Sequence, residues 1–199
     1  MIAVITGDIV NSRQAPVNEW LSLLKDGLYL YGKESRDWEI YRGDSFQLRL
    51  EPELALEAAY QIKAAIKQHK DLDVRIAIGI GEQDFKGKSI SESNGSAFIR
   101  SGLCFEDLRK QLMGISTGNR SKDEVLNLLF SLALLTMNSW SPTVAATVSS
   151  FLQHPDKSQT EMAGMLGKSQ SSLSEALKRG GYDEIMQLDT YYRKEIGNL

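Results

Sequence analysis

Two stretches decide how this chain folds: Ile5-Thr6-Gly7-Asp8-Ile9-Val10-Asn11-Ser12 and Tyr41-Arg42-Gly43-Asp44-Ser45-Phe46. Each carries a Gly-Asp pair where an apolar run meets a turn. Residues 2–5 are continuously apolar, which predicts a central buried strand. Residues 38–41 and 46–50 alternate apolar and polar side chains around Gly43-Asp44, which predicts a β-hairpin.

The rest of the first half predicts an α+β domain. Apolar side chains at helical spacing predict helices over 17–31, from 52 to 66 and from about 97 to 112. Alternation over 74–80 predicts a fourth strand. The order βαββαβ plus a helix is the ferredoxin-like arrangement. In it the first and third strands are antiparallel neighbours about 4.8 Å apart. Asp8, just past the first strand, and Asp44, just before the third, should therefore meet.

Two converging carboxylates point to a cation, because they repel one another unless a cation or a shared proton intervenes. Mg²⁺ or Mn²⁺ is the expected ion, together with a nucleotide or other phosphate ligand bound through it. The simpler alternative is that each aspartate caps its own turn through the side chain.

The second half predicts helices only. The polar, Gly-containing stretch 114–121 reads as a linker, which divides the chain into an α+β domain over 1–117 and a helical domain over 118–199. One helix follows Ser121 and another follows Pro142. The first of these carries more apolar surface than a short helix needs, which makes it a candidate for homodimerisation through Leu126, Leu129, Phe130, Ala133 and Met137.

Residues 158–180 predict a helix-turn-helix. A short helix over 160–166 ends at Gly167, which can adopt positive φ, and Ser169 caps the next helix. Met162, Leu166, Leu173 and Leu177 should be buried, with Met165 able to join them. The candidate DNA-binding residues are Lys168, Ser169, Gln170, Ser171, Ser174, Lys178 and Arg179. The alternative is a helix-turn-helix used for protein contacts or packing. After Gly180-Gly181 a closing helix is expected rather than a β-wing.

Bulk composition limits the alternatives. The chain has 199 residues, 42% hydrophobic and 25% charged, as in an ordinary soluble protein. A single cysteine, Cys104, excludes an internal disulfide framework and favours a reducing cytoplasm. No apolar run is long enough to span a membrane, and the start does not read as a signal peptide. The net charge of -3 gives no overall attraction to DNA, so a local patch would have to supply it.

The first half resembles class III nucleotide cyclases, diguanylate cyclases and the polymerase palm. The resemblance is carried by Gly7-Asp8-Ile9, Gly43-Asp44-Ser45-Phe46 and the strand 74–81. It implies that Asp8, Asp44 and the backbone carbonyl of Ile9 bind two divalent ions that hold a triphosphate. Asn11, Ser12, Arg13 and Gly43 are the phosphate-binding candidates. Arg100 is the candidate catalytic arginine, and is otherwise a solvated helix residue. No base-reading pair is evident.

Over nearly its full length the chain resembles the SatD family, through the opening run to Arg13, the Gly-Asp hairpin and the helix-turn-helix. That resemblance implies a cytoplasmic, regulator-like protein. The sequence therefore predicts a transcription regulator in which a nucleotide-binding, cyclase-like domain with magnesium controls a DNA-binding domain. The alternative is an active nucleotidyl cyclase or nucleotidyltransferase whose helical domain serves dimerisation or targeting. A third reading is a scaffold without a ligand.

Overall fold

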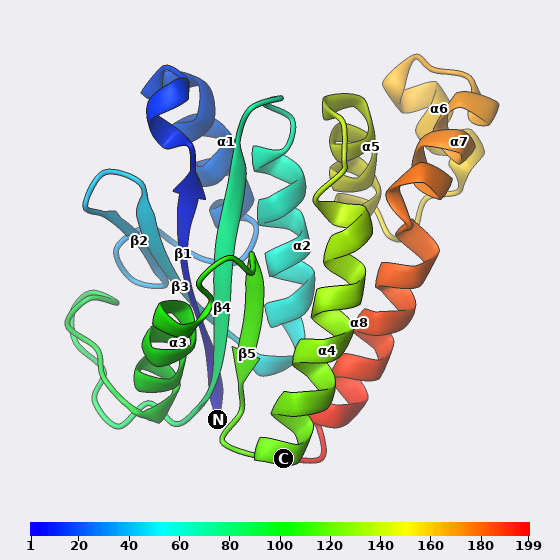
Figure 1. The fold of residues 1–199 in the computed structure, drawn as a ribbon. Coiled ribbons are helices and arrows are strands. Elements are labelled where there is room, and N and C mark those ends of the chain that lie inside the picture. Colours follow the sequence, from blue (N-terminus) through cyan, green and yellow to red (C-terminus); the bar gives the residue numbers. More distant parts are fainter.

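Strand β1 (Ile2–Val10) is the middle strand of a five-stranded mixed sheet in the computed structural model, which describes residues 1–199 (Figure 1). The other strands are β2 (Trp38–Tyr41), β3 (Ser45–Leu50), β4 (Asp73–Gly81) and β5 (Met113–Ser116), and the order across the sheet is β2-β3-β1-β4-β5. Strand β1 is antiparallel to both β3 and β4. Strand β5 runs parallel to β4 and forms one edge. The fold class is α+β, as expected.

Eight α-helices accompany the sheet: α1 (Val17–Tyr29), α2 (Ala55–Ile66), α3 (Ser96–Asp107), α4 (Arg120–Met137), α5 (Pro142–Gln153), α6 (Gln159–Leu166), α7 (Gln170–Gly180) and α8 (Tyr182–Ile196). Short 3-10 turns precede α1 (η1, Ser12–Gln14) and α2 (η2, Pro52–Leu54). None of these helices combines the length and the apolar composition that a membrane crossing requires.

The two faces of the sheet are covered differently. Ala3, Ile5 and Ile76 point to the side of α1 and α2 and belong to the main core. The other face is covered by α3, which approaches closely at Gly79, where a Cβ atom would lie 2.3 Å from backbone atoms of α3. Glycine is therefore required there for packing. On this face the hydroxyl groups of Thr6 and Ser101 form a buried hydrogen bond of 3.0 Å.

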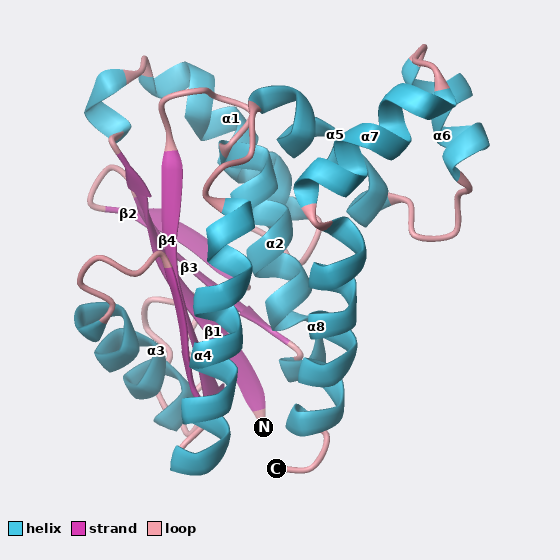
Figure 2. Ribbon diagram, turned by 45° about the vertical axis from the view of Figure 1, so that its right-hand side comes forward, coloured by secondary structure: helices cyan, strands magenta, loops and turns pink.

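The C-terminal helices continue the core on the α2 side (Figure 2). A single cluster of buried side chains extends from Ala3 to Ile196. The amide of Gln61 on α2 donates a buried 2.8 Å hydrogen bond to Ser149 on α5. The hydroxyl of Tyr192 on α8 donates to the Pro52 carbonyl at 2.7 Å. No break in the core accompanies the boundary predicted between residues 117 and 118, and the division into two domains stays a prediction.

Strand β5 lies mostly within the stretch predicted to be a linker. The helix expected to reach residue 112 ends at Asp107, and Met113–Ser116 then pairs with β4. Both backbone groups of Ile115 are bonded to the side-chain amide of Asn127 on α4, at 2.9 and 2.8 Å. An asparagine therefore occupies hydrogen-bonding positions that an edge strand normally leaves open.

Helices α6 and α7 stand at the margin of the molecule, at the upper right of Figure 1, away from the sheet. They share a small cluster of their own with α5, formed by Phe151, Met162, Ala163, Leu173 and Leu177. The chain then passes through Gly181, at φ 62°, directly into α8. The closing element is a helix, as expected.

Candidate functional site

The two aspartates are brought together at one end of the sheet. Strand β1 is longer than expected, so Asp8 lies inside it and pairs in register with Ser45 on β3 and Arg75 on β4. Asp44 immediately precedes β3, and its backbone carbonyl accepts a 3.2 Å hydrogen bond from the N–H of Ile9. We call this end of the sheet, with Asp8, Asp44, Arg75 and Ser12, the acidic end.

Arg75 was not anticipated and is the main partner of Asp8. Its Nε donates to Oδ1 of Asp8 at 2.9 Å and its Nη2 donates to Oδ2, so the contact is bidentate. These hydrogen bonds raise the pKa of the Arg75 guanidinium, against the opposing effect of burial. The guanidinium also lies 4.9 Å from the ring centroid of Phe105 on α3, a cation–π distance. Arg75 is thus held in place from two directions.

The carboxylate of Asp44 has fewer hydrogen-bond partners than that of Asp8. The Asp44 carboxylate accepts a 2.5 Å hydrogen bond from the hydroxyl of Ser12, the only predicted phosphate-binding residue that bonds to it. Asn11 and Gly43 lie on the two adjoining turns with φ of 63° and 92°, and Arg42 also has positive φ. The side chain of Asn11 donates instead to the Asp71 carbonyl at 3.3 Å. Arg13 and Arg42 are exposed on these turns.

Arg100 does not join this cluster. Its Nη1 donates to the carbonyls of Ile80 and Thr117 at 2.6 and 3.0 Å. Ile80 lies five residues beyond Arg75 along β4, which is on the order of 16 Å away. Arg100 therefore links, by hydrogen bonds, the end of β4 farther from Asp8 to the segment before α4. Arg100, the candidate catalytic arginine, is therefore not placed beside Asp8 and Asp44.

The acidic end does not fit the two-ion centre that the cyclase resemblance implies. Nowhere do three or more His, Cys, Asp or Glu side chains gather as metal ligands. Both oxygens of Asp8 are already bonded to Arg75. The carboxylate of Asp44 has only a hydroxyl partner. The available ligands therefore suit a single Mg²⁺ whose other ligands are phosphate oxygens and water. The carbonyl of Ile9 would be the nearest backbone candidate by sequence.

A signal for Arg75 was present in the sequence. Arg75 alternates with Val74 and Ile76, so it must face away from the apolar side of the sheet. Antiparallel pairing of β1 and β4 then places it opposite Asp8. Pairing of the first and third strands predicted that Asp8 and Asp44 meet, whereas the position of Arg75 depends on the register of the fourth strand.

The second candidate surface is the exposed side of α7. Helix α6 begins with a capping box between Ser158 and Glu161 and ends at Gly167, at φ 60°. Ser169 caps α7 by accepting from the N–H of Ser172. Leu173, Ala176 and Leu177 are buried, and a shallow surface without apolar residues lies opposite them, lined by Gln170, Ser171, Ser172, Ser174, Glu175 and Lys178.

The predicted DNA-binding residues lie on or beside this polar face. Lys168, Ser169, Gln170, Ser171, Lys178 and Arg179 are exposed, and Ser174 is half-buried. The amide of Gln170 donates to the side chain of Gln159 on α6 at 3.0 Å, so it is oriented in the free protein. Met165, which could have joined the buried set, is 55% exposed, and Leu166, expected to be buried, is half-buried.

Comparisons of the chain with protein-family models, curated proteins and solved structures find no match.

Proposed function

We propose that this protein is a DNA-binding regulator of the SatD type that senses a phosphate-bearing ligand such as a nucleotide. Helices α6 and α7 form its helix-turn-helix, and the acidic end of the sheet is its ligand site. The observation that carries the proposal is the exposed, wholly polar face of α7 on a helix pair that stands apart from the main core.

The helix pair has the features that a helix-turn-helix needs. A glycine with positive φ joins the two helices, and a small buried residue, Ala163, lies on the first helix. The N-terminal half of the second helix offers Gln170 and Ser171, which suit adenine and mixed base edges respectively. Residues 157–179 contain four basic and two acidic side chains, a net +2. That charge is small for phosphate contacts, so two copies acting together would bind much better than one.

The acidic end offers groups for a phosphorylated ligand. The sheet order β2-β3-β1-β4 with helices after β1 and β3 supports a ferredoxin-like assignment of this half. Arg75, Arg13 and Arg42 supply positive charge around Asp8 and Asp44. A Mg²⁺ ion that arrives with the phosphates would be held by Asp44. This arrangement favours binding of the ligand over its chemical conversion.

Helix α5 links the helix pair α6/α7 to the layer of helices that covers the sheet on the face opposite α3. It packs against α2 under the sheet and against α7 on the other side. The indole N–H of Trp140, just before α5, donates a 2.9 Å hydrogen bond to the carbonyl of Gly180 at the end of α7. For the ligand to control DNA binding, it must have different affinities for two arrangements of these helices.

Fluorescence anisotropy with labelled genomic DNA fragments tests the DNA-binding proposal. Gln170→Ala should change which fragments are preferred, because it removes a base contact. Lys168→Ala should weaken binding to all fragments and reduce its salt dependence, because it removes a phosphate contact.

Lys194→Ala is the matched control, since Lys194 is an exposed lysine at the opposite end of the molecule, near the C-terminus. It should leave binding unchanged. If neither Gln170→Ala nor Lys168→Ala differs from this control, the helix-turn-helix serves protein contacts or packing.

The convergence of Asp8 and Asp44 favours one second candidate, a nucleotidyl cyclase or nucleotidyltransferase. Incubation with each nucleoside triphosphate and Mg²⁺ or Mn²⁺, followed by chromatography of the products, distinguishes it. A cyclic or oligomeric product made by the wild type and lost in Asp44→Ala would establish an enzyme.

A further inference from the structure

Helix α4 exposes a row of leucines. Leu128, Leu132 and Leu135 are 62%, 55% and 75% exposed, and Val125 begins the row. The spacing of these four residues, three, four and three, is that of positions that face a partner helix. We call Leu128, Leu132 and Leu135 the α4 ridge. From Val125 to Pro155 the sequence has no Asp, Glu, Lys or Arg, so no charge interrupts this face.

The ridge residues differ from the five expected from the sequence to mediate dimerisation, of which Leu129 and Ala133 are half-buried and line a groove beside the ridge. Of that set, Leu126, Phe130 and Met137 are fully buried in the core of their own chain. The helix is apolar around most of its circumference, so periodicity alone did not separate its inner face from its outer one.

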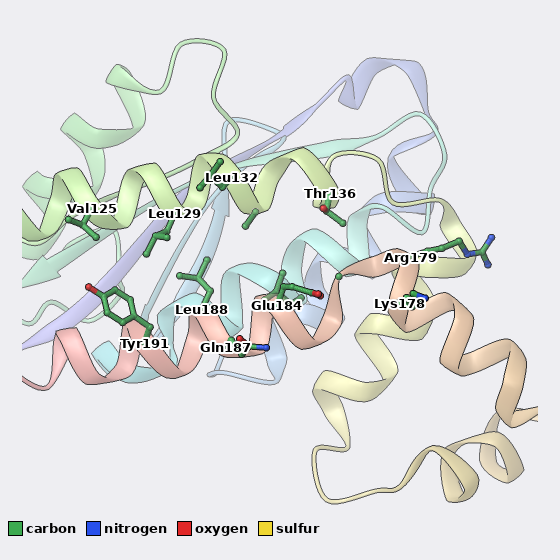
Figure 3. A pocket seen from close by; sticks show the side chains of 13 residues that line it. Val125, Leu129, Leu132, Thr136, Lys178, Arg179, Glu184, Gln187, Leu188 and Tyr191 are labelled. Carbon is green, nitrogen blue, oxygen red and sulfur yellow. The ribbon is translucent and has the colours of Figure 1, made fainter.

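A groove runs beside the ridge, between α4 and α8 (Figure 3). It has a volume of about 920 Å³ and an apolar floor that includes Leu129, Ile185 and Leu188. Val125 and Tyr191 lie at one end, and Thr136 and Arg179 lie at the other. We call this the α4/α8 groove. Leu128 and Leu135 are not part of its lining, so a small molecule in the groove would leave them exposed.

We propose that a second copy of this chain covers both features, with the α4 ridge of each copy seated in the α4/α8 groove of the other. The two helices α4 would run antiparallel about a two-fold axis. A ridge and a groove on one face are self-complementary under such an axis, which is the requirement for an isologous dimer. An apolar face of this extent on a soluble protein marks an interaction site.

Charge placement supports a second copy in this orientation. Glu124 lies one helical turn before Leu128, at the N-terminal end of the ridge, where its 67% exposed side chain forms only a solvent-exposed i,i+4 ion pair with Arg120. Arg179 lies at the end of the groove next to the C-terminal end of α4. Antiparallel packing sets Glu124 of each copy opposite Arg179 of the other, which gives two ion pairs by symmetry. A parallel arrangement would not bring these charges together.

Sedimentation analysis of the full chain, without DNA, tests the proposal. The wild type should have twice the 22.2 kDa mass of one chain. The double variant Leu128→Asp/Leu135→Asp should sediment as a monomer, with a dissociation constant raised at least about 30-fold. Both leucines are already exposed, so the monomer should fold as before, which its circular dichroism spectrum checks.

Leu103→Asp is the matched control, because Leu103 is equally exposed (59%) on α3 and lies outside the groove. Its mass should stay that of the wild type. Glu124→Arg and Arg179→Glu should each weaken the dimer, and combining them should restore it if the helices are antiparallel. A wild type that is monomeric over the whole concentration range, or a dimer unaffected by the Leu128/Leu135 variant, would overturn the proposal. Because DNA is absent, either outcome leaves the DNA-binding proposal intact.

Discussion

Each of the two ends of the sheet has an aspartate that forms an ion pair with an arginine. The ends differ in how completely their aspartates and arginines are paired. At the end away from Asp8, Asp37 accepts hydrogen bonds from Arg36, from Arg49 at 2.6 Å and from the backbone N–H of Lys33 at 3.0 Å. Its side chain is only 10% exposed and Arg49 only 12%. The charges of Asp37, Arg36 and Arg49 are thus all paired within the fold.

At the acidic end, Arg75 bonds to only one of the two carboxylates. Asp8 and Arg75 are 21% and 31% exposed, and Asp44 is left with a hydroxyl. The comparison shows that an arginine–carboxylate pair by itself does not mark a binding site. In the proposed site, what matters is a carboxylate that has no arginine partner and lies beside exposed turns, because a ligand can complete its set of partners.

Asp37→Ala should cost the most. Removing the carboxylate leaves Arg49 largely buried with only Gln83 as a side-chain partner. Breaking one side of such a pair costs roughly 3–5 kcal/mol of unfolding free energy. Urea unfolding followed by circular dichroism measures it. The exposed Asp71 provides a control, since Asp71→Ala should change stability by less than about 0.5 kcal/mol. Equal effects of the two variants would contradict a structural role for Asp37.

Lowering the pH should reduce the stability that Asp37 contributes, over a defined pH range. Burial alone would raise the pKa of Asp37, but the hydrogen bonds from Arg36, Lys33 and Arg49 outweigh it and lower the pKa from 3.8 to about 2. A carboxyl with a lowered pKa stabilises the fold fully above pH 3.8. The stabilisation is lost as the pH falls toward the folded-state value. About 1–2 kcal/mol should disappear, allowing for solvent screening.

Unfolding free energies of the wild type and Asp37→Asn across this pH range provide the test. The gap between the two proteins should narrow as the pH falls from 3.8 toward 2. A constant gap would mean that the carboxylate of Asp37 does not titrate as its contacts indicate.

Arg75→Ala should have a moderate effect, about 1 kcal/mol, because both members of the pair are partly exposed. It also frees Asp8 beside Asp44. Mg²⁺ alone should therefore raise the melting temperature of Arg75→Ala and leave that of the wild type unchanged. Arg75→Lys, which keeps the charge, should behave more like the wild type. Equal responses of Arg75→Ala and the wild type to Mg²⁺ would show that Arg75 does not block the ion.

Asp44→Ala should change stability least, by less than about 1 kcal/mol, since one hydroxyl contact is lost. Its effect should appear with ligand. ATP and GTP are the probes, each with and without Mg²⁺. A nucleotide that binds the wild type and is present at about 100 times its Kd should raise the free energy of unfolding by roughly 2.7 kcal/mol. The Mg²⁺-dependent part of that stabilisation should vanish in Asp44→Ala. A wild type that responds to neither nucleotide would argue against the ligand.

Much of the fold was open to prediction because its elements repeat a clear pattern. Alternation at 74–80 and leucine spacing in the helices identified most strands and helices, and antiparallel pairing brought Asp8 to Asp44 as expected. Strand β5 was missed because four residues with one glycine show no alternation, and the neighbouring strand and Asn127 define it. The magnesium, nucleotide, DNA and dimer partners stay predictions.

The site was predicted only in part because spacing along the sequence does not set direction in space. The resemblance to cyclases implied a catalytic role for Arg100, but α3 starts at the end of β4 farther from Asp8 and presents Arg100 there. Arg75 looked like an ordinary polar residue of a strand. Its importance depends on the register between β1 and β4, which a local pattern does not contain.

The pairing of Asn127 with Ile115 has a consequence for how the molecule meets other chains. Because that amide already satisfies the backbone of Ile115, an incoming extended peptide finds no free donor or acceptor at the centre of β5. A further strand therefore cannot pair with the centre of β5 at this edge of the sheet. Such strand addition is one common route to fibrous aggregates. Contacts made on this side of the protein are thereby directed to its helices.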